Sequence, residues 1–255
     1  MNFREDKKVI IPILLVLAAF VGWKSWKDLN PPVIEKQQVV FDTRYFVRDE
    51  ASLKAVPDNG GSIIIWAGDL GMEGLTPSPI APVSIPQREV DPLYVMPEIP
   101  TDLPKVFPII QENIESWRGQ NNTFNAIFID YTAAKPDLVM LEDFCSKLRT
   151  YLKKNYWLFI RLRRDAVESA PNRKIWLANM GKDVQAFAFD RKEERKPAES
   201  LEEMIKNLDS LGAPFVIVTD EIPDYASLTK TFKDARPKFF AAFMLDMTAL
   251  RQSTQ

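Results

Sequence analysis

The hydrophobic positions of this 255-residue chain alternate along the sequence between two patterns, one typical of strands and one typical of helices. Short runs of β-branched, aromatic and aliphatic residues recur, and their continuity is typical of strands buried on both faces. A weaker run occupies residues 93–96, and residues 39–47 alternate apolar and polar positions as a strand does. The strong runs predict strands at residues 62–66, 125–129, 156–160, 184–189, 214–218 and 238–244.

Apolar residues at helical spacing fill most of the intervals between these runs. In residues 103–117, the side chains of Val106, Ile110 and Ile114 share one face, and residues 138–152 repeat this pattern. Buried strands that alternate with helices indicate a parallel sheet in an α/β fold. The remaining predicted helices lie at residues 173–180, 199–211 and 225–235.

About seven strand–helix units predict a (β/α)8-type TIM barrel, either complete or degenerate. An open, doubly wound sheet is the structural alternative. Sheets of that kind often carry a glycine-rich dinucleotide-binding loop after the first strand. Gly68 and Gly71 follow the first strong strand here without the spacing of that loop. The barrel is therefore the preferred prediction.

A proline-rich stretch interrupts this rhythm. Residues 76–108 hold about half of the chain's 19 prolines, a spacing that predicts neither a long helix nor a central strand. The stretch follows the first strong strand, on the side where βα loops build the active sites of barrels. We interpret it either as an inserted lid or partner-docking loop, or as an ordered surface crossing without a functional role.

The N-terminal segment has the pattern of a membrane anchor. Residues 9–23 are almost uninterruptedly apolar and lie between basic residues, while Trp23 and Trp26 suit an interfacial aromatic belt. A cleaved signal peptide is the alternative, but no small-x-small cleavage pattern follows the run. We predict a membrane anchor at 1–29, a proline-containing stalk at 30–38 and the barrel domain at 39–255. The basic N-terminus then predicts a single-pass protein of the bacterial cytoplasmic membrane with a periplasmic or extracellular domain.

Composition excludes several classes of function. With 33 Lys and Arg against 35 Asp and Glu, the chain lacks the basic excess that nucleic-acid binding requires. The chain has no histidine, so a histidine base or a histidine-ligated metal is excluded. Its single cysteine, Cys145, cannot form an intramolecular disulfide and is interpreted as a packed helix residue. We expect neither a cofactor nor a metal.

Acidic residues follow the predicted strands. Because the carboxyl ends of parallel barrel strands meet around one mouth, such carboxylates would converge there. Glycoside hydrolysis needs two carboxyl groups about 5 to 9.5 Å apart and no metal or histidine. Asp is also a common helix cap and turn residue, which is the alternative reading of each position. The strand-end acids are Asp69, Asp130, Asp190, Asp220, Glu221 and Asp246.

The strand at 125–131, which ends in Asp130 and Tyr131, and the helix at 138–152 resemble the central signature of a bacterial family of uncharacterised domains. That family is grouped with the TIM-barrel glycoside hydrolases. Residues 63–68, 157–162 and 176–190 follow in compatible order, so the resemblance extends over about three quarters of the chain. It implies a carbohydrate-directed barrel centred on Asp130. Thr132 stands where the family pattern has a second acid.

These observations lead to a functional hypothesis and its alternative. The chain is predicted to bind or hydrolyse an envelope polysaccharide, with Asp130, Asp220 and Glu221 as candidate catalytic residues. The alternative is an inactive barrel that serves as an interaction or scaffold module for an envelope protein. A nucleotide-dependent enzyme lacks support because no phosphate-binding loop is present. The candidate substrate-binding residues are Asp69, Glu73, Arg161, Arg163 and Asp190.

Overall fold

The computed structural model describes residues 42–57, 61–80, 88–119, 124–152, 156–191, 199–231 and 239–247, which belong to one compact unit. The predicted anchor at 1–29 and stalk at 30–38 lie outside these described residues and remain predictions. Within the described ranges, no helix combines the length and apolarity that a membrane span requires.

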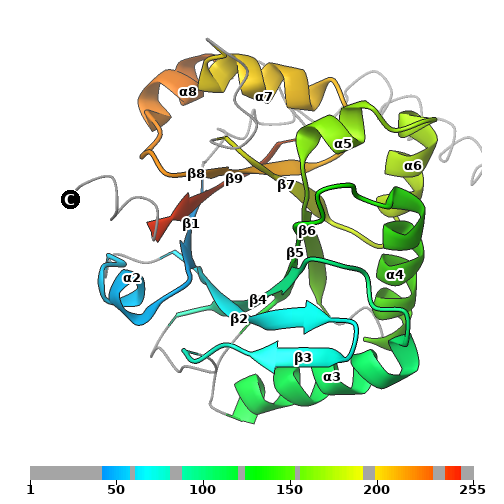
Figure 1. Ribbon diagram of the computed structural model, residues 1–255. Coiled ribbons are helices and arrows are strands. Elements are labelled where there is room, and N and C mark those ends of the chain that lie inside the picture. Colours follow the sequence, from blue (N-terminus) through cyan, green and yellow to red (C-terminus); the bar gives the residue numbers. More distant parts are fainter. Residues whose placement is uncertain are drawn as a thin grey trace, which may run out of the picture. The chain divides into compact units, whose positions relative to one another are not determined.

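The fold is a closed barrel of parallel strands (Figure 1). In the nine-stranded sheet, β3 is an antiparallel addition to β2, and the other eight strands are parallel. Closure follows from β1, which pairs in parallel with both β2 and β9. This ring confirms the predicted barrel and rules out an open sheet. The barrel strands are β1 (Asp42–Val47), β2 (Ile63–Gly71), β4 (Val90–Met96), β5 (Ala126–Tyr131), β6 (Trp157–Arg161), β7 (Ala186–Asp190), β8 (Phe215–Thr219) and β9 (Phe239–Asp246).

Helices connect most of the strands and lie outside the ring (Figure 1). Side chains of Asp137, Ser200 and Asp224 accept hydrogen bonds from the first-turn amides of their helices, so the caps come from residues outside the strand-end acids. Between β2 and β4, the described residues form β3 (Gly74–Pro77) in place of a helix. The helices are α2 (Glu50–Lys54), α3 (Leu103–Gly119), α4 (Leu138–Tyr151), α5 (Arg164–Glu168), α6 (Arg173–Met180), α7 (Leu201–Asp209) and α8 (Tyr225–Thr231).

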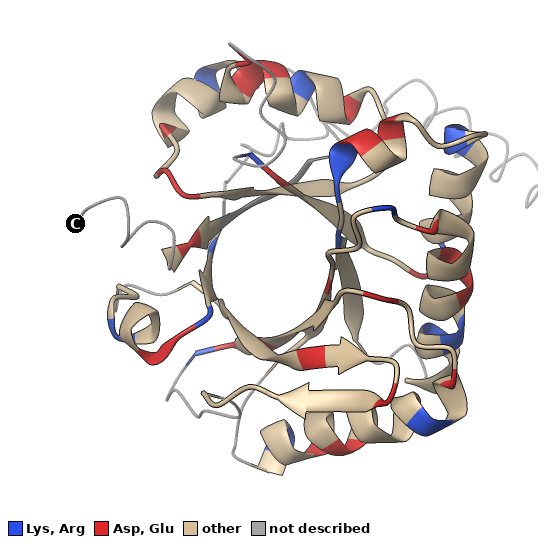
Figure 2. Ribbon diagram, viewed as in Figure 1, with Lys and Arg blue, Asp and Glu red and all other residues tan. Residues whose placement is uncertain are grey.

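Alternation along each strand produces two apolar layers. On β5, for example, Ile127 and Ile129 pack outward in the large cluster beneath the helices, while Phe128 packs inside the barrel. Charged residues gather on the helices and at the strand ends, whereas the strands are mostly uncharged (Figure 2). The inner apolar layer consists of Phe46, Ile64, Leu93, Ala126, Phe128, Phe159, Ala186, Ala188, Val216 and Val218.

The expectation that the proline spacing of residues 76–108 excludes a central strand is wrong, whereas the weak strand at 93–96 and the helix at 103–117 are confirmed. β4 is a central barrel strand that contains Pro92, and α3 begins inside the same range. Pro104 is the second residue of α3, where a missing amide proton removes no intrahelical bond. Pro108 lies inside the helix, and burial of Val106 and Ile110 beside it holds α3 in place. Packing of α3 against the barrel therefore overrides the proline signal.

A β-bulge interrupts β2 between Trp66 and Gly68, where the pairing with β4 shifts register. Gly68 has a φ of +150°, a conformation that side-chain-bearing residues rarely adopt. A Cβ atom at this position would lie 2.4 Å from the carbonyl oxygen of Thr76 on β3 and 2.9 Å from Leu75 Cδ1. The bulge thus requires glycine.

Replacing Gly68 by alanine is expected to lower the free energy of unfolding by about 1–3 kcal/mol, because the new Cβ meets the β3 backbone. Thermal unfolding followed by circular dichroism measures the loss. Gly71→Ala is the matched control, since an added Cβ there meets nothing within 4 Å. Equal melting temperatures for the two variants would contradict this account of the bulge.

Candidate functional site

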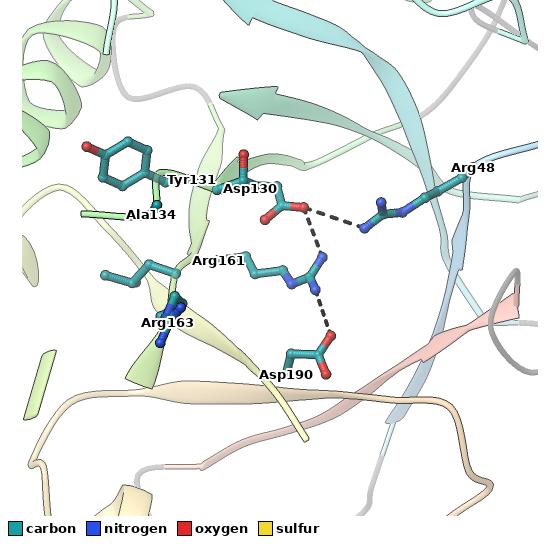
Figure 3. A pocket seen from close by; sticks show the side chains of 9 residues that line it. Arg48, Asp130, Tyr131, Ala134, Arg161, Arg163 and Asp190 are labelled. Atoms are coloured by element: carbon teal, nitrogen blue, oxygen red, sulfur yellow. Dashed lines mark hydrogen bonds and ion pairs between the residues drawn. The ribbon is translucent and has the colours of Figure 1, made fainter. Parts of the chain in front are cut away.

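Three charged side chains from neighbouring strands meet at the mouth of the barrel. Asp130 near the end of β5 pairs in register with Arg161, the last residue of β6, and Asp190 ends β7. The three side chains face the inside of the barrel, because Phe128, Phe159 and Ala188 lie two residues earlier on the same strands and pack inside the barrel. Figure 3 shows the three side chains pointing toward one another.

Arg161 bridges the two carboxylates. Its Nη1 lies 2.9 Å from Asp130 Oδ2, and its Nη2 lies 2.6 Å from Asp190 Oδ2. Asp130, Arg161 and Asp190 are only 3%, 7% and 9% exposed, so these charge-assisted hydrogen bonds form largely away from water. Arg161 therefore fixes the positions of both aspartates. Here we call Asp130, Arg161 and Asp190 the mouth cluster.

A second arginine reaches the mouth cluster from the opposite side (Figure 3). Arg48 directly follows β1, and its Nη2 lies 3.7 Å from Asp130 Oδ2. Its guanidinium carbon sits 4.8 Å from the centre of the Phe46 ring, within the range of a cation–π contact. Arg48 is exposed, unlike Arg161. The sequence prediction missed Arg48, although it continues the inward alternation of Arg44 and Phe46 on β1.

A pocket of about 510 Å³ opens over the mouth cluster. The loop after β5 forms one wall, and Tyr131 holds this loop by accepting a hydrogen bond from the amide of Asp137. The lining is predominantly polar and includes three arginines. Its residues are Arg48, Asp130, Tyr131, Thr132, Ala134, Arg161, Leu162, Arg163 and Asp190.

The charge arrangement favours binding over acid–base chemistry. Arg161 donates a hydrogen bond to each carboxylate and thereby holds one oxygen of each in a fixed place as an acceptor. A glycosidase requires one carboxyl group that carries a proton to its leaving group. The mouth cluster holds two aligned acceptors and a fixed cation instead. Such an arrangement suits the recognition of a polar ligand.

The structure brings four of the eight predicted site residues into this pocket: Asp130, Asp190, Arg161 and Arg163. Arg161 binds the mouth carboxylates. Arg163 lines the pocket while its guanidinium pairs with Asp165 on α5.

The other four predicted residues lie outside the lining of this pocket. Glu221 is exposed and accepts a hydrogen bond from Arg191 Nη1 at 2.5 Å, and Asp220 follows β8 beside it. Glu73 lies in the turn between β2 and β3, where it lines a separate hollow with Ile109. Asp69 accepts a hydrogen bond from Trp66 Nε1 at 3.0 Å. Of the three candidate catalytic residues, only Asp130 lines this pocket, and the catalytic roles of Asp130, Asp220 and Glu221 all stay predictions.

A second buried contact between an arginine and an aspartate occupies the opposite end of the barrel. Asp91 on β4 is fully buried, and its Oδ2 accepts a hydrogen bond from Arg44 Nη1 at 3.1 Å. Its Oδ1 accepts the amides of Asn125 and Ala126 at 3.2 and 3.0 Å. Phe46 and Leu93 separate this pair from the mouth cluster, because each follows its charged neighbour by two residues. The sequence prediction missed both Asp91 and Arg44.

Burial raises the pKa of Asp91 to about 7, and the nearby charge of Glu89 acts in the same direction. The amides of Ala126 and Asn125 and the guanidinium of Arg44 oppose this shift of the pKa. Burial also raises the pKa of the Cys145 thiol, which lies inside α4 as a packed residue. Among the described residues, no cluster of three or more Asp, Glu or Cys side chains could hold a metal ion.

No protein-family model matches the chain, and no curated protein matches it. One solved structure with similarity is the HpcH/HpaI aldolase from Desulfitobacterium hafniense DCB-2, at a TM-score of 0.34 and 11% sequence identity. The alignment covers 85% of this chain and 90% of the aldolase chain. Of the resemblance expected from the sequence, the barrel is confirmed by the closed ring of parallel strands, and the likeness to glycoside hydrolases stays a prediction.

Proposed function

We propose that this barrel binds a saccharide unit, such as one sugar of an envelope polysaccharide, in the mouth pocket. The observation that carries the proposal is the mouth cluster, in which Arg161 holds the Asp130 and Asp190 carboxylates in fixed positions. A carboxylate offers about four lone-pair sites, so an oxygen bound by arginine retains capacity for ligand hydroxyls. Sugars present such hydroxyl groups on neighbouring carbons.

The size and polarity of the pocket support this ligand class. Its volume of about 510 Å³ lies within the range of small-molecule sites, and its lining supplies acceptors from aspartates and donors from arginines. The exposed guanidinium of Arg48 reaches the rim, where an acidic sugar would meet a cation. In this proposal, the protein binds the saccharide without hydrolysing it. The predicted anchor at 1–29 would place the barrel on the outer side of the cytoplasmic membrane.

The proposal is tested by titrating the full chain with glucose, N-acetylglucosamine and glucuronate. At least one sugar is expected to raise the melting temperature, with a stabilisation of about 2.7 kcal/mol at one hundred times its Kd. Asp190→Asn should weaken this binding roughly 10- to 100-fold, because a hydrogen bond to a charged acceptor is lost. Isothermal calorimetry provides the affinities.

Asp143→Asn is the matched control for that substitution. Asp143 is exposed on α4 and pairs with Lys147, so its loss should leave sugar affinity unchanged. Binding by neither the wild-type chain nor the control, with circular dichroism showing a folded barrel, would contradict the proposal.

The scaffold alternative has one observation in its favour. A second hollow of about 660 Å³ lies between α3 and α4, where Leu103, Phe107 and Tyr151 provide a partly apolar lining. A folded chain that binds no saccharide would favour the scaffold.

A further inference from the structure

Because of the bulge in β2, the side chains of Trp66 and Asp69 both face the interior of the barrel. Trp66 pairs with Leu93 and Asp69 pairs with Val95, and both partners on β4 face inward. In a regular strand, positions 66 and 69 would face opposite sides of the sheet. The extra residue at the bulge removes this difference, and re-aiming a side chain is a recurrent role of bulges beside functional sites.

Trp66 and Asp69 form a pair at the same mouth as the pocket. The indole Nε1 of Trp66 donates to Asp69 Oδ1 at 3.0 Å, which fixes the orientation of the ring. Both residues are partly exposed, whereas the apolar residues below them are buried. Part of the indole surface therefore stays exposed at the mouth, while the rest packs against the inner apolar layer.

Arg48 connects this pair with the mouth cluster. Val47 pairs with Ile65, so Arg48 and Trp66 come next in register on the neighbouring strands β1 and β2. The Arg48 guanidinium in turn lies 3.7 Å from Asp130. Trp66 and Asp69 thus lie on the side of the mouth from which Arg48 reaches the pocket.

We propose that Trp66 and Asp69 form a second sugar subsite, so that the mouth accommodates two consecutive units of a saccharide chain. This inference rests on the proposed function. The apolar C–H face of a pyranose ring would stack on the indole, as apolar ligand surfaces do on aromatic side chains. Asp69, already held by the indole N–H, would accept a hydroxyl hydrogen of the same unit. The strained glycine at the bulge is the structural requirement for this arrangement.

The experiment compares mono-, di- and tetrasaccharides of the glucose, N-acetylglucosamine and glucuronate series on the full chain by calorimetry. The wild-type chain should bind the disaccharide of its preferred series about tenfold more tightly than the monosaccharide, as expected for one added stacking contact. Trp66→Leu should remove this gain. Asp69→Asn retains an acceptor for the indole and should reduce the gain by a smaller factor.

Trp157→Leu is the matched control, because Trp157 is also exposed but begins β6 at the opposite end of the barrel. It should keep the full gain from the second unit. Equal affinities for mono- and disaccharides, or a gain that persists in both Trp66→Leu and Asp69→Asn, would overturn the subsite while leaving the pocket proposal intact. Failure of every saccharide to bind would overturn both.

Discussion

Replacing Arg161 by methionine is expected to lower the free energy of unfolding by about 3–5 kcal/mol, because it removes the buried cation that two buried carboxylates share. Asp130 and Asp190 are both nearly buried, and each accepts a hydrogen bond from the same guanidinium. For a domain of this size, such a loss corresponds to a fall of roughly 6–20 °C in melting temperature. Urea unfolding followed by tryptophan fluorescence gives the free energy directly.

Two comparisons separate the ion bridge from simple loss of side-chain volume. Arg163→Met removes an exposed arginine that pairs with Asp165, and should change stability by about 1 kcal/mol or less. Adding Asp130→Leu and Asp190→Leu to Arg161→Met removes the unpaired charges and should restore much of the stability. This triple variant should remain unable to bind saccharide. A loss of under about 1 kcal/mol for Arg161→Met alone would contradict the bridge.

Asp91 is expected to make the barrel less stable as the pH rises from about 4 to about 7. Its pKa in the folded chain is raised to about 7 by burial, whereas an unfolded aspartate titrates near 4. At pH values between about 4 and about 7, Asp91 holds a proton in the folded state that it has released in the unfolded state. Stability therefore falls with increasing pH across this window, by as much as roughly 4 kcal/mol from this group.

Asp91→Asn isolates this contribution, because an asparagine keeps an acceptor for the amides of Asn125 and Ala126 but does not titrate. The difference in free energy of unfolding between the wild-type chain and Asp91→Asn, measured in urea at several pH values, should decrease from pH 4 to 7. Glu89→Gln serves as the second comparison, since removing that charge should lower the pKa of Asp91 and narrow the window. A wild-type chain that gains stability relative to Asp91→Asn over this range would show that Arg44 keeps Asp91 ionised throughout.

The barrel could be predicted from sequence because its strands are buried on both faces. Runs such as Ile63–Ile65 and Ile127–Ile129 contain no polar interruption, and helical spacing between runs placed α3, α4 and α6 almost to the residue. The signal failed where tertiary packing overrides local preference. β4 contains a proline and a charged residue, so its apolar run at 93–96 gave only a weak signal, and its central place in the barrel depends on its neighbours.

The candidate site was only partly predictable, for a geometric reason. The position of acids at strand ends follows from sequence, and Asp130 and Asp190 do meet at the mouth. Which acids share a partner depends on the stagger between strands: Arg161 reaches Asp130 and Asp190, while Glu221 pairs with Arg191. The bulge that turns Asp69 inward is set by pairing with β4. Inward alternation of Arg44, Phe46 and Arg48 is the signal that would have identified the missed Arg44 on β1 and the missed Arg48 directly after it.

Closure by β1 has a consequence for the synthesis of this protein. The strands from β2 onward can join the sheet in chain order, apart from β3, but the pairing of β1 with β9 must wait for the last barrel strand. Until then the growing chain exposes open strand edges, which readily pair with other chains. A chain cut after α8 would keep those edges permanently. We therefore expect such a fragment to aggregate, even though every residue of the mouth cluster lies before the cut.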